Sequence, residues 1–472
     1  MDTPPAATES PGVRLVVDQL PNLGREQELL DAIGLATIDD LFSDIPESVR
    51  RTEPLDLPGP QSEEEIWADA QRLLSKNVPL TSRPSFIGAG LYQNHVPTMV
   101  PMLATRGEFL TAYTPYQPEV SQGMLQAMWE FQTMVSELVA LPVANVSMYD
   151  ASTAAAEAIT CAVRVHSRKA ARPDVIYIAE WTPENRRSVI QNYIQGAGIE
   201  LRFLGGSDGL IDLGAAEEAA GCAAVYVEQP NPFGIIDPGL AELKAILGED
   251  TALIVGVNPS SLGVIAPPGD WGADIVVGEG QCFGIGPTGG GPIYGLFACR
   301  DPYLRQMPGR IVGLAKDESG RRAFTLTLST REQHIRRHKA TSNICSNETL
   351  IALMGAMHMA LLGPEGLERL SLRNVAACAR TKEAVLAIDG MEPLHPDAAH
   401  YNEFTVVLPG PAADALAFLD AGGVTGGLAL RDIMGEGADE SWLLITATDQ
   451  TTESDITALA DGLAAWCAEV NG

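Results

Sequence analysis

Short apolar runs alternate with amphipathic stretches through the middle of the chain, and this alternation predicts the fold class. The runs are rich in Val, Ile and Ala, and the stretches between them carry apolar residues at helical spacing. Strands that alternate with helices form a mainly parallel sheet with right-handed crossovers. The predicted strands are 174–178, 201–204, 223–227, 252–257 and 273–277, and the predicted helices are 124–141, 150–165, 184–195, 213–220 and 238–247. We therefore expect a large α/β domain.

Two further patterns flank this α/β domain. On the N-terminal side, residues 26–49 and 62–76 show helical spacing, and Ser62 with Glu65 matches a capping box. On the C-terminal side, a smaller α/β pattern follows Gly363-Pro364. A helix is predicted before this break at 348–362; after it, the predicted helices are 365–388, 412–420 and 453–468, and the predicted strands are 403–408 and 442–446. The expected parts are a mostly helical N-terminal arm at 1–80, a large α/β domain at 81–345, and a bridging helix with a small C-terminal α/β domain at 346–472.

Charge and hydropathy exclude several classes of partner. The 472 residues carry a formal net charge of −30. Nucleic acid and anionic membranes bind through clustered Lys and Arg, so neither is expected as a partner. No apolar run approaches the roughly 18 to 20 residues of a membrane span. The N-terminus also lacks the basic and apolar regions of a signal peptide, so we expect a cytoplasmic protein.

The cysteines and histidines give no metal or disulfide pattern. The seven cysteines are scattered and never form a C-x-x-C pair, which favours reduced thiols. His334 and His338 are four residues apart in a predicted basic helix, but no glutamate completes an H-E-x-x-H pattern. No metal site is expected.

The charge is unevenly distributed along the chain. Residues 300–339 contain ten basic and four acidic residues, whereas residues 389–472 contain fifteen acidic residues and one basic residue, Arg431. The basic stretch either docks an acidic partner or contacts the acidic C-terminal part of the same chain. The sequence leaves both alternatives open.

A ligand is expected beyond the strand ends, because doubly wound sheets bind ligands at the carboxyl ends of their strands. The segments 228–231, 258–260 and 279–291 follow three of the predicted strands. The third segment is rich in Gly and Pro and leads into a second apolar run, 293–298. It holds no lysine, no metal-ligand pair and no cysteine beside a histidine. The reactive group that such a loop would carry is absent.

The start of the helix at 150–165 is a second candidate for ligand binding. Asp150, Ser152 and Thr153 open this Ala-rich helix. A helix N-terminus presents free N–H groups and the positive end of the helix dipole, which suit a phosphate or carboxylate. Every capped helix shares this property, so an anion site there is one of two readings.

Five motifs resemble one enzyme family. They are SFIGAGLYQNHVP, TAYTPYQPEVSQG, LPVANVSMYDASTAAAEA, GADIVVGEGQ and REQHIRRHKATSNIC. Together they resemble the P protein of the glycine cleavage system, glycine dehydrogenase (decarboxylating), in its first-half type, which in two-subunit systems is a separate chain called subunit 1. The resemblance runs from about residue 25 to the C-terminus. It implies a fold-type I pyridoxal-phosphate-transferase-like large domain with a small C-terminal domain.

The resemblance also implies a reaction. The complete P protein holds glycine on pyridoxal phosphate, releases CO2 and passes the aminomethyl group to the lipoyl arm of the H protein. That chemistry requires a lysine just after a strand and an acidic partner for the pyridine nitrogen. This chain has Gly278-Glu279-Gly280-Gln281 where the lysine is expected and Asn258 where the acid is expected.

The six lysines offer no obvious replacement. Four of them lie on polar faces of predicted helices, where a solvated charge is expected; these are Lys76, Lys169, Lys244 and Lys382. Lys316 falls in a predicted polar loop, and Lys339 in the basic motif. We therefore expect no covalent cofactor in this chain. Pyridoxal phosphate is expected in a partner, glycine dehydrogenase subunit 2, within a heterotetramer that acts on lipoylated H protein.

The resemblance suggests which residues this chain contributes. Tyr113, Tyr116 and Glu119 lie in a polar loop and are candidates for completing the partner's active site. The tyrosines would orient the glycine carboxylate or the lipoyl thiol, and Glu119 would take part in proton transfer; packing at the subunit interface is the alternative for the tyrosines. Three motif residues, Arg336, Lys339 and Asn343, are candidates for ordering the loop, the interface or the H-protein dock.

Two other functions stay open at this point. One is an autonomous pyridoxal-phosphate enzyme that uses Lys339. The other is a cofactor-free regulatory or binding protein that has kept the fold without the chemistry.

Overall fold

The computed structural model describes residues 21–51, 53–167, 174–289 and 291–471. It divides into two compact units, Met1–Val78 and Pro79–Gly472, which are treated separately below.

The first unit is helical in its described part. Helix α2 spans Glu26–Ile33, a 3-10 helix spans Ile38–Phe42 and helix α3 spans Glu63–Leu74. The predicted capping box opens α3: the Glu65 N–H donates to Ser62 Oγ at 3.3 Å, and the Ser62 N–H donates to the Glu65 carboxylate at 2.7 Å. The capping box is confirmed, and both predicted stretches, 26–49 and 62–76, contain helices. Within 26–49, the part that follows Thr37 forms a tighter 3-10 helix rather than an α-helix.

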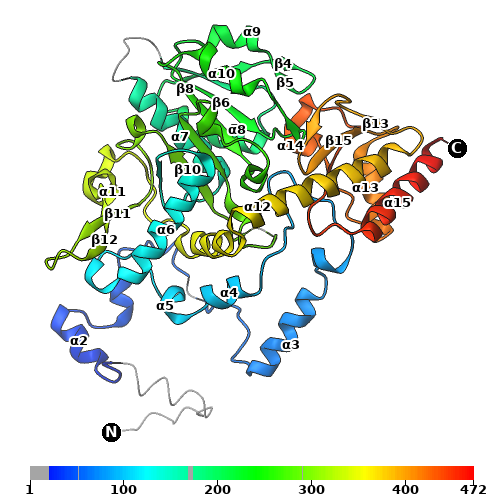
Figure 1. Ribbon diagram of the computed structural model, residues 1–472. Coiled ribbons are helices and arrows are strands. Elements are labelled where there is room, and N and C mark those ends of the chain that lie inside the picture. The colour runs from blue at the N-terminus through cyan, green and yellow to red at the C-terminus, as the bar shows by residue number, and fades with distance from the viewer. Residues whose placement is uncertain (1–20, 52, 168–173, 290, 472) are drawn as a thin grey trace. The chain divides into compact units, whose positions relative to one another are not determined.

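A seven-stranded sheet forms the centre of the second unit (Figure 1). Its order is β1-β10-β9-β8-β6-β2-β3, in which β2, β3, β6, β8 and β9 are parallel; at one edge, β10 runs antiparallel to β9, and β1 runs antiparallel to β10. The strands are β1 (Val143–Ala144), β2 (Val175–Ala179), β3 (Glu200–Leu204), β6 (Ala224–Gln229), β8 (Ala252–Val257), β9 (Ile275–Glu279) and β10 (Gly295–Cys299). All five predicted strands are confirmed, and the second apolar run is β10.

Helices cover both faces of this sheet because successive strand residues point to opposite sides. Val225 and Val255 join one hydrophobic core, whereas Tyr226 and Ile254 join a second core on the other face. The covering helices are α6 (Gln122–Val139), α7 (Ala151–His166), α8 (Glu184–Ile194), α9 (Leu213–Ala216) and α10 (Leu240–Leu247). The predicted α/β fold class with a mainly parallel sheet is therefore confirmed.

A kinked helix leads to a second, smaller sheet. Helix α12 spans Thr349–Leu386 and bends at Gly363, whose φ of 59° interrupts the helical backbone before Pro364. The predicted break is thus a kink inside one helix. The small sheet has the order β13-β15-β17-β16. Its strands are β13 (Glu392–Pro393), β15 (Glu403–Val407), β16 (Leu428–Ala429) and β17 (Trp442–Thr446), with helices α13 (Ala412–Ala421), α14 (Arg431–Met434) and α15 (Glu453–Asn471).

Helix α12 passes a length and composition test for a membrane span, as does no other helix among the residues that the structure describes. It contacts α6, α15 and the 3-10 turn Pro259–Gly263. Residues such as Ala352 and Leu353 are fully buried among these elements. These contacts are typical of a core helix.

The basic stretch contains a hairpin that the sequence analysis did not predict. Strands β11 (Ile311–Lys316) and β12 (Arg322–Thr327) pair antiparallel, so Lys316 ends a strand rather than lying in a loop. The predicted basic helix is also wrong. Helix α11 (Gln333–Arg336) stops at Arg337, whose φ is 55°, and His334 and His338 therefore share no helical face.

The basic stretch does not pair with the acidic C-terminal part of the chain in the described structure. Its ion pairs there are local, for example Arg321 with Asp317 at 2.8 Å. The acidic part pairs with other arginines, as in Arg380–Glu453 at 2.7 Å. Figure 1 shows β11 and β12 on one side of the second unit and α13 and α15 on the other. An acidic partner for the basic stretch stays a prediction.

Candidate functional site

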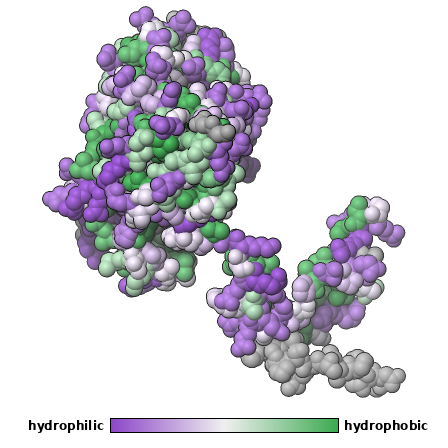
Figure 2. All heavy atoms as spheres, turned by 90° about the vertical axis from the view of Figure 1, so that its right-hand side faces the viewer, coloured by the Kyte–Doolittle hydropathy of each residue, from purple (hydrophilic) through white to green (hydrophobic). Residues whose placement is uncertain are grey.

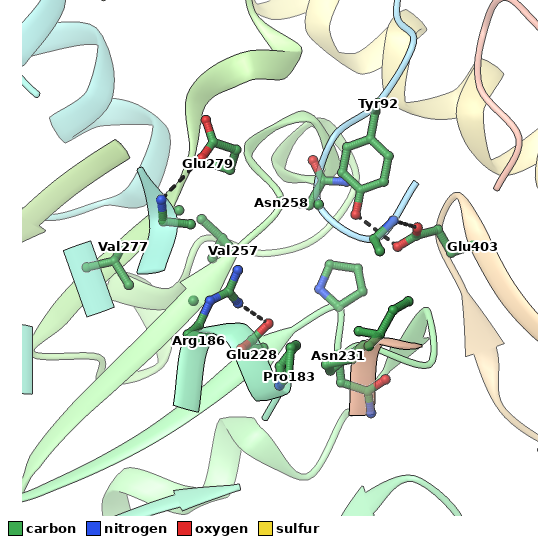
Figure 3. A pocket seen from close by; sticks show the side chains of 18 of the residues that line it. Tyr92, Pro183, Arg186, Glu228, Asn231, Val257, Asn258, Val277, Glu279 and Glu403 are labelled. Atoms are coloured by element: carbon green, nitrogen blue, oxygen red, sulfur yellow. Dashed lines mark hydrogen bonds and ion pairs between the residues drawn. The ribbon is translucent and has the colours of Figure 1, made fainter. Parts of the chain in front are cut away.

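A small cavity lies at the carboxyl ends of β6, β8 and β9 (Figure 3). Its volume is about 60 Å³. The residues that line it include Tyr92, Arg186, Glu228, Asn258, Glu279 and Glu403. Three of them come from the segments predicted after the strands, so the cavity is at the edge where the sequence placed a ligand.

An ion pair forms one wall of the cavity. Arg186 of α8 places Nη1 2.5 Å from Glu228 Oε2, and both side chains are largely buried. The Tyr226 hydroxyl donates to the other Glu228 oxygen at 3.0 Å. Because the carboxylate neutralises the guanidinium, Arg186 offers little excess positive charge to an anion in the cavity.

The Glu279 carboxyl lies against the N-terminus of α7. One carboxyl oxygen, Oε2, accepts from the Ala151 N–H at 3.1 Å. The other oxygen, Oε1, accepts from the N–H groups of Tyr294 at 3.2 Å and Gln281 at 3.3 Å. Burial raises the pKa of Glu279 to about 8, even though these hydrogen bonds favour the ionised form. The predicted anion site at the start of this helix is therefore occupied by a side chain of the same chain.

A second buried carboxyl ties the cavity to the small sheet. Glu403 of β15 accepts from the Tyr92 hydroxyl at 2.9 Å, from the Ala89 N–H at 2.6 Å and from the Thr446 hydroxyl at 2.8 Å. Burial raises the pKa of Glu403. These contacts hold the segment around Ala89 and Tyr92 against the edge of the cavity.

Asn258 makes its hydrogen bonds within the protein. Its Oδ1 accepts from the Ser260 N–H at 3.1 Å and from the Ser260 hydroxyl at 2.8 Å. Its Nδ2 donates to Asn402 Oδ1 at 3.4 Å. The side-chain amide thus closes the turn after β8.

The predicted tyrosine loop lies away from this cavity. Tyr113 and Tyr116 precede a 3-10 turn, Pro118–Val120, that contains Glu119. The side chains of Tyr113 and Tyr116 are 76% and 53% exposed, and Glu119 is also exposed. None of the three residues lines the cavity.

The loop nevertheless contacts the basic motif. The Tyr113 hydroxyl is 2.6 Å from Ser346 Oγ. The Arg310 guanidinium lies over the Tyr116 ring, 5.6 Å from its centroid, and the His334 ring packs edge-on with that ring at 5.9 Å. The loop therefore contacts one residue of this motif, His334, together with Arg310 and Ser346 on either side of it.

The three motif candidates are exposed on this side of the molecule. Arg336 donates from Nε to the Thr330 carbonyl at 3.1 Å, and Lys339 and Asn343 are exposed. Asn343 is next to Ser342, whose hydroxyl donates to the buried Glu157 carboxyl at 2.5 Å. The backbone around Asn343 is thus anchored while its side chain faces outward.

Comparison with known proteins identifies the family. The model of the glycine cleavage system P-protein family matches residues 21–463. The chain belongs to this P-protein family. A probable glycine dehydrogenase (decarboxylating) subunit 1 of Thermococcus onnurineus is 47% identical over 365 residues, which cover 76% of this chain and 80% of that protein. The protein of the same description from Pyrococcus furiosus is 42% identical over 452 residues, covering 94% and 98%.

Solved structures agree with the assignment. A crystal structure of glycine decarboxylase (P-protein) of the glycine cleavage system, in inhibitor-bound form, has a TM-score of 0.83 and 38% identity, covering 96% of this chain and all of that one. An apo cysteine desulfurase from Thermococcus onnurineus has a TM-score of 0.61 at 17% identity, covering 88% of this chain and all of that chain. The latter shows the fold alone, which is fold type I of the pyridoxal-phosphate enzymes.

The cavity of this P-protein chain does not fit pyridoxal phosphate. Its volume of about 60 Å³ is well below the roughly 300 Å³ at which ligand pockets begin. The carboxyl of Glu279 takes the backbone donors of α7, and the charge of Arg186 is neutralised by Glu228. Asn258 provides an amide where a protonated pyridine nitrogen would require a carboxylate. No lysine is among the described residues that line the cavity.

Besides Lys316, two lysines are placed differently from the sequence prediction. Lys244 is not solvated: its Nζ lies 2.8 Å from the Asp274 carboxylate and 2.9 Å from the Thr251 carbonyl oxygen, and its side chain is only 14% exposed. Lys382 is partly buried, which lowers its pKa. Lys76, Lys316 and Lys339 are exposed, and Lys169 lies outside the described residues.

The sequence analysis missed the two polar pairs of the cavity. Arg186 and Glu228 are on different elements, and Tyr92 and Glu403 are 311 positions apart. Two of the four residues carried a signal: Tyr92 falls within one of the motifs that resemble the family, and Glu228 begins a segment predicted after a strand.

Proposed function

We propose that this chain is a subunit of glycine decarboxylase that holds no cofactor of its own and completes the active site of a second subunit. The observation that carries the proposal is the small cavity at the strand ends, where the chain's own Glu279 takes a backbone donor at the start of α7. The family and its subunit 1 members support a role in glycine decarboxylation. The partner in this proposal is glycine dehydrogenase subunit 2, which would supply the lysine and pyridoxal phosphate.

The residues offered to the partner are those of the tyrosine-loop surface, defined here as Tyr113, Tyr116, Glu119 and His334, with the buried Arg310 beneath them. Exposed aromatic side chains are typical of protein interfaces. The two tyrosines are also held in place, because the Tyr113 hydroxyl is hydrogen-bonded to Ser346 Oγ and the Arg310 guanidinium lies over the Tyr116 ring. A fixed, exposed aromatic loop is suited to reach into a neighbouring site.

Each residue has a proposed task at that site. Tyr113 and Tyr116 orient the glycine carboxylate or the lipoyl thiol through their hydroxyls, and Glu119 takes part in proton transfer. Arg336, Lys339 and Asn343 order the interface or contact the lipoylated H protein, which accepts the aminomethyl group. The basic character of residues 300–339 suits an acidic partner.

The first unit supplies a second contact with the partner. Many of its apolar side chains are exposed, and α3 has no buried residue. Figure 2 shows hydrophobic residues at the surface of this unit. Apolar surface of this kind marks interaction sites. The exposed residues include Leu29, Ile33, Phe42, Ile66, Trp67 and Leu73. A cytoplasmic heterotetramer, in which two such heterodimers associate, follows from this proposal.

The proposal is tested by glycine–bicarbonate exchange with lipoylated H protein. The purified chain alone is expected to show neither exchange nor the visible absorbance of bound pyridoxal phosphate, and the mixture with a cognate subunit 2 is expected to show both. Exchange by the isolated chain would contradict the proposal. An equally active mixture after substitution of Tyr113, Tyr116 and Glu119 would instead favour a regulatory or binding role.

A further inference from the structure

We propose that Glu279 is the internal occupant of an anion site at the N-terminus of α7, and that it keeps phosphate groups out of the cavity. The inference deepens the proposed function and rests on it, since a subunit that leaves the cofactor to its partner has a use for a closed site. The ligand class that the site would take without Glu279 is a phosphate or a similar tetrahedral oxyanion.

Three backbone N–H groups from three segments converge on this one carboxyl. Ala151 opens α7, Tyr294 precedes β10, and Gln281 lies in the 3-10 turn after β9. Helix N-termini and convergent backbone N–H groups are the common means by which proteins hold phosphate. Glu279 uses the donors that such an anion would need (Figure 3).

The helix itself is well formed and keeps its own cap. Asp150 accepts from the Thr153 N–H at 2.8 Å, and α7 continues for 16 residues. The Ala151 N–H is therefore available in addition to the cap, at the positive end of a full helix dipole. Glu279 is an added occupant and does not replace the N-cap.

Close packing fixes the position of Glu279. A Cβ on Gly280 would lie 2.2 Å from the Tyr294 ring, and a Cβ on Gly295 would lie 2.4 Å from the Asp150 carbonyl oxygen. A Cβ on Gly278 would lie 2.7 Å from the Val257 carbonyl oxygen. Because no side chain separates these backbones, the strand end has little freedom to withdraw the carboxyl from the helix.

The described lining residues also offer no unpaired positive charge to an added anion. Glu228, Glu279 and Glu403 line it, whereas Arg186 is the one basic side chain among the described lining residues and is paired with Glu228. Burial raises the pKa of Glu279 to about 8, so this carboxyl is mainly neutral near pH 7 and fills the site without a buried charge. A phosphate would bring at least one negative charge to the same place.

The test compares the wild-type chain with Glu279→Ala and Glu279→Gln, using inorganic phosphate as the probe and chloride at equal ionic strength as the reference. Alanine vacates the site, whereas glutamine keeps it filled. Glu279→Ala is expected to gain saturable phosphate binding, seen by 31P NMR line broadening and by a rise of about 1 to 3 °C in Tm at ten times the Kd. The wild type and Glu279→Gln are expected to show neither effect.

Glu279→Ser serves as a second variant in case alanine impairs folding, because its hydroxyl can still accept from the Gln281 N–H. A folded alanine or serine variant that binds no phosphate would overturn the inference. Saturable binding of phosphate in the cavity of the wild-type chain would also overturn the inference. These measurements use the isolated chain without glycine or H protein, so they can fail while the exchange assay with subunit 2 succeeds.

Discussion

The cavity and the tyrosine-loop surface contain similar kinds of residue in opposite situations. In the cavity, Glu279, Glu403 and Arg186 are directed at partners within the same chain. On the tyrosine-loop surface, Tyr113 and Tyr116 are held from behind and exposed in front. The place where the fold usually binds a ligand has become part of the packed interior. The side chains suited to a reaction are displayed outward, where only another molecule can use them.

This difference separates fold from function within one chain. The strand ends of a doubly wound sheet converge whether or not they carry chemistry, so a cavity at that edge follows from the topology. Function depends on the residues present there. The comparison predicts that cavity substitutions change stability, whereas substitutions on the tyrosine-loop surface change activity in the assembled complex.

The largest expected effect comes from breaking the ion pair of the cavity. Arg186→Met leaves the Glu228 carboxylate largely buried and without its cation. We expect the free energy of unfolding of the isolated chain to fall by about 2 to 3 kcal/mol, as measured by urea denaturation.

The double variant Arg186→Met/Glu228→Gln is the control, because it removes the unpaired charge and should recover part of the loss. Equal stability of Arg186→Met and wild type would show that the cavity wall is not part of the stable core. It would also contradict the expectation that substitutions in the cavity change stability.

The next effect is on activity. Tyr116→Ala is expected to lower exchange in the complex with subunit 2 by at least about tenfold, the lower range for a positioned catalytic side chain. The Tm of the isolated chain should change little, because the side chain is 53% exposed.

Tyr116→Phe is the matched variant, since it keeps the ring beneath Arg310 and removes the hydroxyl. Loss of activity in both variants assigns the effect to the hydroxyl. A loss in Tyr116→Ala alone assigns it to packing at the interface, and no loss in either contradicts a role for this surface in the reaction.

A smaller effect concerns pH. The pKa of Glu279 is raised to about 8, whereas an exposed glutamate titrates near about 4.3, so the folded chain holds this proton more tightly than the unfolded chain. Stability from this group is therefore present at low pH and falls as pH rises through 8. The Glu279→Gln variant has no ionisable proton at this position. Between about pH 5 and pH 8.5 the stability difference should move in favour of the variant by at least about 1 kcal/mol.

The measurement is urea denaturation of both proteins across this range. The other ionisable groups that face Glu279 are Asp150, Cys282 and Tyr294, and the variant leaves these residues in place. Parallel curves would show that Glu279 titrates normally and is not held in a buried site.

The sequence predicted most of the strands well because they are short apolar runs that are largely buried, as in β6, β8 and β9; β3 is the exposed exception. Residues 252–257 and 442–446 match β8 and β17. The hairpin β11–β12 was missed because it is half exposed and carries Lys316 and Arg322, which obscure its alternation. A local signal was present in the turn between the two strands, where Gly320 has a φ of 78°.

Only the part of the candidate site that lies at the ends of strands was predictable from the sequence. Asn258 and Glu279 follow predicted strands, so their place at the cavity could be inferred. The contact of Glu279 with Ala151 could not, because it joins positions 128 apart, and neither could the contact between Tyr113 and Ser346, which are 233 apart. Contacts of this range depend on how helices and loops pack around the sheet.

The central claim is that this chain completes a site whose cofactor is held elsewhere, and borohydride trapping tests it most directly. The active complex of this chain with subunit 2 would be loaded with pyridoxal phosphate, reduced with borohydride and mapped by peptide mass spectrometry. We predict a phosphopyridoxyl label on a lysine of subunit 2 and none on Lys76, Lys169, Lys244, Lys316, Lys339 or Lys382 of this chain. Stoichiometric label on any of these six, most tellingly on Lys339, would contradict the account.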